Sequence, residues 1–307
     1  MARTTAQLFD TMFKSIIHDA SASAIVHLIN GIYKKNYPLD MNVKIEPNEF
    51  IKEHPKTGKL ERIVTDIIIT LSSPKEKAKD VFLLEAQIDD DLDMTLRIFN
   101  YSTAIALRSR KVSKDNSYMK IKMPVPAVIY WETSKTKDIV EIEIEFPDNK
   151  TVVYEVPSFK ILNHNVSELE GLALLLPFYI LKIRKELKRT TNPGKRTQLA
   201  KKLEGYILEI DETIKKCKKN NYISNEDAEM LRGRMLKMNK ELYGEYNEFK
   251  EVDMTLKQLL KVDAWEARKQ GEKRGVSRTA AKLKSMGFSI AQIIEATGLS
   301  RREISAL

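Results

Sequence analysis

The texture of the chain changes near Ser167, and this change limits the possible folds more than any other feature. Before it, short runs rich in Ile, Val and Phe alternate with turn residues, a pattern typical of strands. After it, Gly and Pro become sparse and apolar residues recur every three or four positions, which predicts long helices. The chain is therefore expected to be α+β in its first half and α-helical in its second.

The first half predicts a helix, a three-stranded meander, a second helix and a further strand. The opening helix should cover residues 7–33, with Gly31 near its end. The second helix should cover 89–111, because acids stand at its beginning and bases at its end, as the helix dipole favours. The expected strands lie within 43–71, interrupted by HPKTGK, at 80–88 after SSPKEKAK, at 125–132, and in EIEIEF and TVVYEV around the turn PDNK.

The second half predicts helices at 168–190 and 196–219, and a third over much of 225–270. The last segment has the pattern of a helix followed by a small helix-turn-helix unit, with Gly298 in the turn and Ser300 as a helix cap. The expected parts are an α+β domain at 1–166, a basic long-helix region at 167–270 and a small helical tail at 271–307.

One carboxylate stands inside each of two apolar runs, Asp66 in RIVTDIIIT and Glu85 in DVFLLEAQI. Desolvating a carboxylate is costly, so such acids need a compensating cation. Residues of equal parity share one face of a strand, so antiparallel neighbours would bring Asp66 and Glu85 together, with Gln87 on the face of Glu85. Two interpretations stay open: a divalent cation such as Mg²⁺, which prefers oxygen ligands, or a structural ion pair with a lysine or arginine.

Several short motifs follow one another on these expected elements. They are D-x-x-F-K at Asp10, Phe13 and Lys14, then Asp66, then E-x-Q at Glu85 and Gln87, then M-x-x-R-x-x-x-Y at Met94, Arg97 and Tyr101. Together they resemble the PD-(D/E)XK nuclease superfamily, and within it the recombination-promoting nuclease and nuclease-family transposase group. The resemblance covers residues 7–132 well and the helical half more loosely. Met94 and Tyr101 are expected to pack in the core.

The resemblance implies a restriction-endonuclease-like core and a DNA endonuclease that hydrolyses phosphodiester bonds, in recombination or on mobile elements. It implies that Asp66, Glu85 and the backbone carbonyl of Ala86 bind Mg²⁺, for which Mn²⁺ substitutes. Whether an acid of the opening helix, Asp10 or Asp19, joins them is left open.

Gln87 takes the position of the usual lysine of the family. Glutamine offers neutral hydrogen bonds where lysine supplies a positive charge, so Gln87 would help to orient the attacking water, and activity is expected to be weak. The alternative is a degenerate nuclease fold that binds DNA or a protein. A helical assembly factor with a fortuitous acid pair is a third hypothesis.

Contacts to DNA are expected from basic side chains. Arg97 and Lys14 would touch phosphates near the acids, and Arg301 and Arg302 open the last helix, where a DNA-reading helix carries such residues. For Arg97, an ion pair with a neighbouring aspartate is an equal alternative. Residues 182–220 carry 13 Lys or Arg against 5 acids, which indicates a surface for a polyanion or a solvated basic face. Homo-oligomerisation through the helical half stays open.

Composition excludes several classes of site. A single cysteine, Cys217, rules out an intrachain disulfide, and the histidines are scattered without zinc spacing. The N-terminus lacks the pattern of a signal peptide. The longest apolar run, LALLLPFYIL, contains Pro177 and has about half the length of a membrane span. We therefore expect a cytoplasmic protein without a membrane partner.

Overall fold

The computed structural model of the chain describes residues 5–46, 49–53, 60–74, 79–88, 93–114, 117–132, 135, 137–299 and 301–305. Contacts group the chain into two compact units, Met1–Leu256 and Lys257–Leu307. This division lies neither at 166 nor at 270, where the sequence placed its boundaries. After residue 166, η2 packs against α2 and α6 packs against α1, so these helices belong to the same unit as the sheet.

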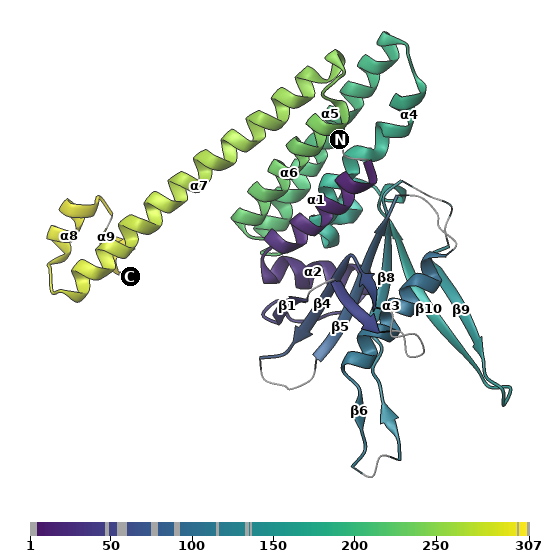
Figure 1. The fold of residues 1–307 in the computed structure, drawn as a ribbon. Helices are drawn as coiled ribbons and strands as arrows, with labels where there is room; N and C mark the ends of the chain where they lie inside the picture. The colour runs from purple at the N-terminus through teal and green to yellow at the C-terminus, as the bar shows by residue number, and fades with distance from the viewer. Residues whose placement is uncertain are drawn as a thin grey trace. The chain divides into compact units, whose positions relative to one another are not determined.

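The described elements up to β10 are two helices, a group of strands, a third helix and a second group of strands, and those after β10 are helical (Figure 1). In chain order they are α1 (Thr5–Asp19), α2 (Ala22–Tyr33), β1 (Asn42–Glu46), β2 (Glu49–Glu53), β3 (Leu60–Val64), β4 (Ile67–Ser72), β5 (Lys79–Gln87), α3 (Met94–Arg108), β6 (Lys111–Val112), β7 (Met119–Lys120), β8 (Val125–Tyr130), β9 (Ile139–Glu145), β10 (Thr151–Lys160), η1 (Ile161–Asn163), η2 (Val166–Ile183), α4 (Arg184–Arg189), α5 (Pro193–Lys219), α6 (Asn225–Tyr243), η3 (Asn247–Phe249), α7 (Lys250–Ser285), α8 (Ile290–Thr297) and α9 (Arg301–Ser305).

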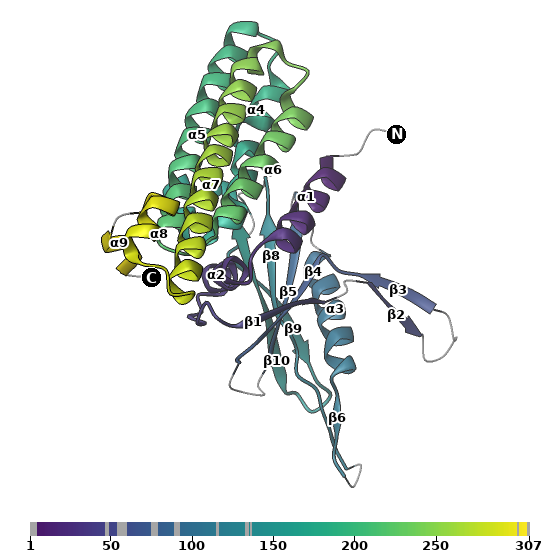
Figure 2. The same cartoon turned by 90° about the vertical axis from the view of Figure 1, so that its left-hand side faces the viewer.

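Six strands form one mixed sheet in the order β1-β4-β5-β8-β10-β9 (Figure 2). The strands β1, β4 and β5 make an antiparallel meander, β8 runs parallel to β5, β10 runs parallel to β8, and β9 pairs antiparallel with β10. Two short antiparallel pairs, β2 with β3 and β6 with β7, stand outside this sheet. The expected α+β class and the order of helix, meander, helix and strand are thus confirmed.

Helix α3 covers one face of the sheet because its apolar side chains recur at helical spacing. Met94 and Ile98 are fully buried and belong to one cluster with Leu83 of β5. Tyr101 packs against the same cluster, so Met94 and Tyr101 are core residues, as the sequence predicted. This packing fixes α3 over the strand that carries Glu85.

The opening segment forms two helices, α1 and α2, where the sequence predicted one over 7–33. Ser21 caps α2, because its hydroxyl accepts a hydrogen bond from the N–H of Ala24. The N–H and hydroxyl of Ser21 donate to the two carboxylate oxygens of Asp227 in α6, at 2.7 and 2.6 Å. Asp227 also caps its own helix by accepting from the N–H of Ser224. A residue 206 positions away thus sets the helix break.

Gly31 lies inside α2 and does not end it, since α2 closes at Lys34 with a left-handed φ of 50°. A Cβ at Gly31 would lie 2.5 Å from the carbonyl oxygen of Gly171 and 2.6 Å from Cδ2 of Leu172, both in η2. We expect Gly31→Ala to lower the free energy of unfolding by about 1–3 kcal/mol, because backbone must move to make room. Urea unfolding measures this. Gly205→Ala, where a new Cβ meets nothing within 4 Å, should not destabilise, and an equal loss in both variants would refute close packing as the cause.

The helical half begins with η2, a run of 3₁₀ turns where an α-helix was predicted over 168–190. Pro177 lies inside this run and has no N–H to donate, and Leu172 has non-helical backbone angles of φ −135° and ψ 39°. The helix predicted over much of 225–270 is two helices, α6 and α7. They are separated by Gly244, which caps α6, and by the turn η3.

The second unit contains α7 from Lys257 onward, together with α8 and α9. Ser289 and Gln292 form a capping box at the start of α8, and Gly298 ends it with a φ of 70°. The three helices share a small core of Ala280, Ile293, Leu299 and Ile304. Gly298 thus occupies the expected turn, whereas Ser300 lies outside the described residues. No described helix of the chain is long and apolar enough to cross a lipid bilayer.

Candidate functional site

The two acids that the sequence expected to meet lie side by side. Strands β4 and β5 pair with Ile67 opposite Leu84, which sets Asp66 beside Glu85. Asp66 does not stand in the middle of a strand, as the sequence suggested. It lies in a bend between β3, which ends at Val64, and β4. The apolar run is continuous there, but the chain changes partners, from β2 to β1 and β5.

Each of the two acids accepts a hydrogen bond from a backbone N–H that belongs to the other acid or to the residue next to it. The N–H of Asp66 donates to Oε1 of Glu85 at 3.1 Å, and the N–H of Ala86 donates to Oδ2 of Asp66 at 2.7 Å. Glu85 is 4% exposed, and the side chain of Asp66 is 17% exposed. One oxygen of each carboxylate, Oδ2 of Asp66 and Oε1 of Glu85, is thus fixed by a backbone N–H.

Helix α1 adds a lysine and a third acid. Nζ of Lys14 lies 3.3 Å from Oδ1 of Asp66 and 2.7 Å from Oδ1 of Asp10. Asp19, the other acid that the sequence left open, pairs instead with Arg234 of α6. The lysine ion pair that the sequence allowed for is therefore present. The sequence did not predict the contact of Lys14 with Asp66. The spacing of Asp10 and Lys14 indicated only that these two side chains share one helix face.

Burial dominates the electrostatics of the acid pair. It raises the pKa of Asp66 to about 6, and the neighbouring Asp10 adds to the rise while Lys14 opposes it. Burial and the charge of Asp66 hold the pKa of Glu85 well above its usual range, against the opposing charges of Arg97 and Lys14. The pair therefore holds its protons more tightly than isolated carboxyl groups do, and a nearby cation opposes this.

Helix α3 turns a basic and an aromatic residue toward Glu85. The guanidinium of Arg97 is close enough to lower the pKa of Glu85, and it lies 3.6 Å from Sδ of Met94. Burial and the charge of Glu85 raise the pKa of Tyr101. The helix face expected to look back at the sheet does so. A phosphate contact by Arg97 stays a prediction. Of the aspartates that could pair with it, Asp89, Asp90 and Asp91 lie outside the described residues, and the backbone carbonyl of Asp93 accepts from the N–H of Arg97 at 2.9 Å.

Gln87 ends β5 on the same face as Glu85 and is partly exposed. Its backbone carbonyl accepts from the N–H of Trp131 at 2.8 Å, which extends the pairing with β8. The indole of Trp131 stacks on Phe178 at 4.0 Å and is buried, so it is a packing residue. The role of the Gln87 side chain in orienting water stays a prediction.

The donor atoms at this place suit a hard divalent cation. Asp66, Glu85 and Asp10 offer carboxylate oxygens, and Oδ1 of Asp10 is buried without a well-directed hydrogen bond. Within the described ranges no three acids, histidines or cysteines are already arranged to hold an ion together. Asp66 and Glu85 would therefore bind the cation with backbone oxygen or water completing its shell. The assignment of the Ala86 carbonyl stays a prediction.

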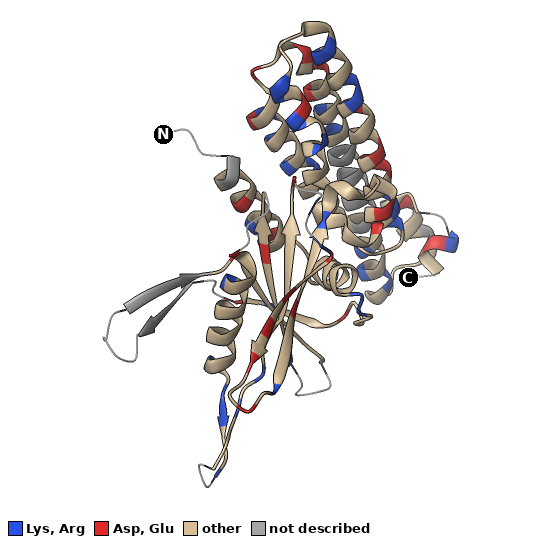
Figure 3. Ribbon diagram, turned by 90° about the vertical axis from the view of Figure 1, so that its right-hand side faces the viewer, with Lys and Arg blue, Asp and Glu red and all other residues tan. Residues whose placement is uncertain are grey.

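The basic strip over 182–220 is partly neutralised by its own surroundings (Figure 3). Its ion pairs are Arg184 with Glu132, Lys195 with Glu186, Lys215 with Asp211 and Glu212, and Lys216 with Glu170. Arg301 and Arg302 are exposed on α9, a helix of five residues in the second unit. DNA contacts by these groups stay predictions.

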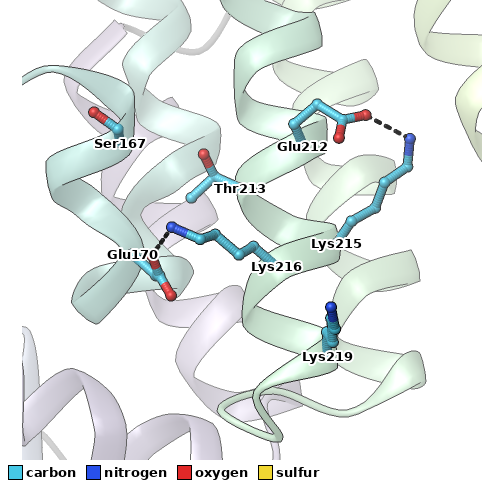
Figure 4. Close-up of a pocket in the computed structure, with 7 residues that line it drawn as sticks. All are labelled: Ser167, Glu170, Glu212, Thr213, Lys215, Lys216 and Lys219. Atoms are coloured by element: carbon cyan, nitrogen blue, oxygen red, sulfur yellow. Dashed lines mark hydrogen bonds and ion pairs between the residues drawn. The ribbon is translucent and has the colours of Figure 1, made fainter.

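A second location is a pocket of about 400 Å³ between η2 and α5 (Figure 4). It is lined by Ser167, Glu170, Glu212, Thr213, Lys215, Lys216 and Lys219. Its charges satisfy one another, with Lys216 at 2.7 Å from Glu170 and Lys215 at 2.8 Å from Glu212. A ligand would have to break these pairs, so the acid pair of Asp66 and Glu85 is the stronger candidate site.

Comparison with known proteins leaves the candidate site to be judged by its geometry. No protein-family model, curated protein or solved structure matches the chain.

Proposed function

We propose that the protein is a metal-dependent DNA endonuclease with a restriction-endonuclease-like core, acting in recombination or on mobile elements. The observation that supports this most is the acid pair, Asp66 and Glu85, held side by side at the start of β4 and in β5, with one oxygen of each fixed by a backbone N–H. Burying two adjacent carboxylates raises the pKa of both, a cost that a divalent cation removes.

Asp66 and Glu85 would hold Mg²⁺ or Mn²⁺, with Asp10 beside them. A cation bound there supplies an activated water and stabilises the charge that builds on a phosphate. Lys14 contributes the positive charge that Gln87 lacks, because its ammonium lies 3.3 Å from Asp66. Arg97, whose charge lowers the pKa of Glu85, would attract a phosphate. Gln87 offers neutral hydrogen bonds to a water.

A degenerate nuclease fold that binds DNA is the second candidate, and one contact favours it. The ammonium of Lys14 already lies between Asp10 and Asp66, so it serves as the compensating cation in the structure itself. If Lys14 stays there, the acids are structural.

Incubation with supercoiled plasmid separates the two candidates. We expect wild type to nick it with Mg²⁺ or Mn²⁺ and not with EDTA, and Asp66→Ala to lose this nicking, because a ligand of the cation is gone. Asp148→Ala, which removes an exposed acid from the turn after β9, is the matched control and should nick normally. Equal nicking by wild type and Asp66→Ala, or none by either with DNA binding retained, would support the binding module instead.

A further inference from the structure

The strands β6 and β7 form a two-stranded ribbon that extends away from the six-stranded sheet at the end of α3 (Figures 1 and 2). Residues 108–114 and 117–122, here called the basic ribbon, contain six Lys or Arg and no acid. The sequence predicted helix up to residue 111 and no element over 112–122, whereas the structure ends α3 at Arg108 and begins β6 at Lys111. The proposed nuclease site does not use this segment.

Register sorts the side chains of the basic ribbon onto two faces. Lys111 is paired with Lys120 and Val112 with Met119. The N–H of Ser113 donates to the carbonyl of Tyr118 at 3.0 Å, which continues the pairing. Opposed residues share a face. One face therefore carries two lysines and Tyr118, which is 66% exposed, and the other carries Val112 and Met119, which are 50% and 54% exposed.

This arrangement is unfavourable for the ribbon alone. Like charges directly opposite in an antiparallel pair repel, and a lone two-stranded hairpin is marginally stable in water. At its base, Lys122 pairs with Asp80 at 2.8 Å. Farther out, no carboxylate among the described residues pairs with Lys111, Lys114 or Lys120. Such an uncompensated cluster is stabilised by a polyanion.

We infer that the basic ribbon binds double-stranded DNA in the major groove. Two strands lie about 4.8 Å apart, so a ribbon with its side chains fits a groove about 12 Å wide. Its lysines then face a duplex that carries one charge per roughly 1.7 Å. A-form RNA has a deep and narrow major groove that would exclude the ribbon. The cations outnumber the exposed apolar side chains, which favours DNA over a lipid surface.

The inference deepens the proposed function, because it names duplex DNA as the polymer that the acid pair would meet. Helix α3 links the two places, with Met94 at the site end and Arg108 at the ribbon end. Its 15 residues span about 22 Å at 1.5 Å each. A duplex of roughly seven base pairs covers this distance, so one DNA molecule reaches both.

Binding is measured without hydrolysis, so that the two proposals fail separately. Glu85→Gln protein in EDTA is titrated against a labelled 24-base-pair duplex by fluorescence anisotropy, between about 50 and 200 mM salt. Adding Lys111→Gln and Lys120→Gln should weaken binding on the order of tenfold and reduce the slope of log K against log salt by about 1.8, since each phosphate contact contributes about 0.9. Lys137→Gln with Lys150→Gln, two exposed lysines near and in the β9–β10 hairpin, is the matched control and should bind as the parent does.

The variant Lys120→Glu tests whether a loss of DNA binding comes from misfolding of the ribbon. It creates a cross-strand pair of opposite charges with Lys111, which stabilises the hairpin, yet it should weaken DNA binding more than Lys120→Gln does. Competition with double-stranded RNA should be weak. An unchanged salt slope in the lysine variants, an equal loss in the control, or binding to anionic vesicles in preference to DNA would each overturn the inference.

Discussion

Glu85→Gln is expected to abolish metal-dependent nicking while raising the melting temperature of the cation-free protein. The amide keeps an oxygen that can accept from the N–H of Asp66. It removes a carboxylate that is 4% exposed and adjacent to another acid. Loss of charge costs the cation a ligand, and the same loss relieves the desolvation of the fold. If Glu85 had only a structural role, its replacement would not produce both the loss of nicking and the rise in melting temperature.

The stabilisation of the cation-free protein by Glu85→Gln should depend on pH. Because the folded pKa of Glu85 is raised, the unfolded chain releases its proton first, above about pH 4.3. The contribution of Glu85 to stability therefore falls as pH rises from there, and Asp66 adds the same trend up to its pKa of about 6. The shift of Asp66, from 3.8 to about 6, corresponds to roughly 3 kcal/mol. The gain from Glu85→Gln should be near zero at pH 4 and widen towards pH 8.

Thermal melts of wild type and Glu85→Gln at about pH 4, 6 and 8, with EDTA or Mn²⁺, test both effects. At pH 8 Mn²⁺ should raise the melting temperature of wild type and leave the variant nearly unchanged. Asp148→Ala removes an exposed acid and should respond to Mn²⁺ as wild type does. A Glu85→Gln protein that is less stable at pH 8 than wild type would show that the charged pair holds the fold together.

Arg232→Met is expected to lower the free energy of unfolding by about 3–5 kcal/mol. Arg232 of α6 is 1% exposed, and its Nε lies 2.6 Å from Oδ1 of Asp211 in α5, which is 3% exposed. Removing the guanidinium leaves a buried carboxylate with one remaining cation. That cation is Lys215, 2.8 Å from Oδ2 of Asp211 and half exposed. Because the ammonium of Lys215 stays accessible to water, it replaces the guanidinium of Arg232 only in part.

Asp211→Leu should also cost about 3–5 kcal/mol, because it removes the carboxylate 2.6 Å from a guanidinium that is 1% exposed. The double variant should lose less than the sum of the two, since both buried charges are then gone. Denaturant unfolding of the four proteins gives the coupling energy. Lys215→Met alone, which removes a solvated partner, is the comparison and should cost about 1 kcal/mol or less. Additive losses would mean that the two charges act independently.

Most strands were predictable because alternation, turns and parity are local, whereas β6 and β7 were missed, since the sequence predicted helix up to residue 111. The meeting of Asp66 and Glu85 followed from strand parity and the short connection between β4 and β5. The bend at Asp66 was not predictable. The run RIVTDIIIT is continuous in hydrophobicity, and the point at which it leaves β2 and joins β1 and β5 depends on pairings made elsewhere in the chain.

The contact of Lys14 with Asp66 was also beyond the sequence, because it depends on where α1 docks. Aromatic packing fixes that position: Phe13 meets the edge of Trp131 at 5.5 Å and lies 6.4 Å from Phe178. These contacts join a helix, a strand end and η2 that are distant in the sequence. The pattern of α1 alone shows which residues share a face and not which acid that face will meet.

The hydrogen bonds that Asp227 makes with the start of α2 can form only after α6 has been synthesised. This carboxylate receives the N–H of Ser21 at the start of α2 and the N–H of Ser224 at the start of α6. Arg234 of α6 also holds Asp19 at the end of α1. A ribosome adds about 5–20 residues per second, so the helix that carries Asp10 and Lys14 waits on the order of ten seconds or more for its support. The support that α6 gives to α1, and through it to the position of Asp10 and Lys14, is therefore absent until the helical half has been synthesised.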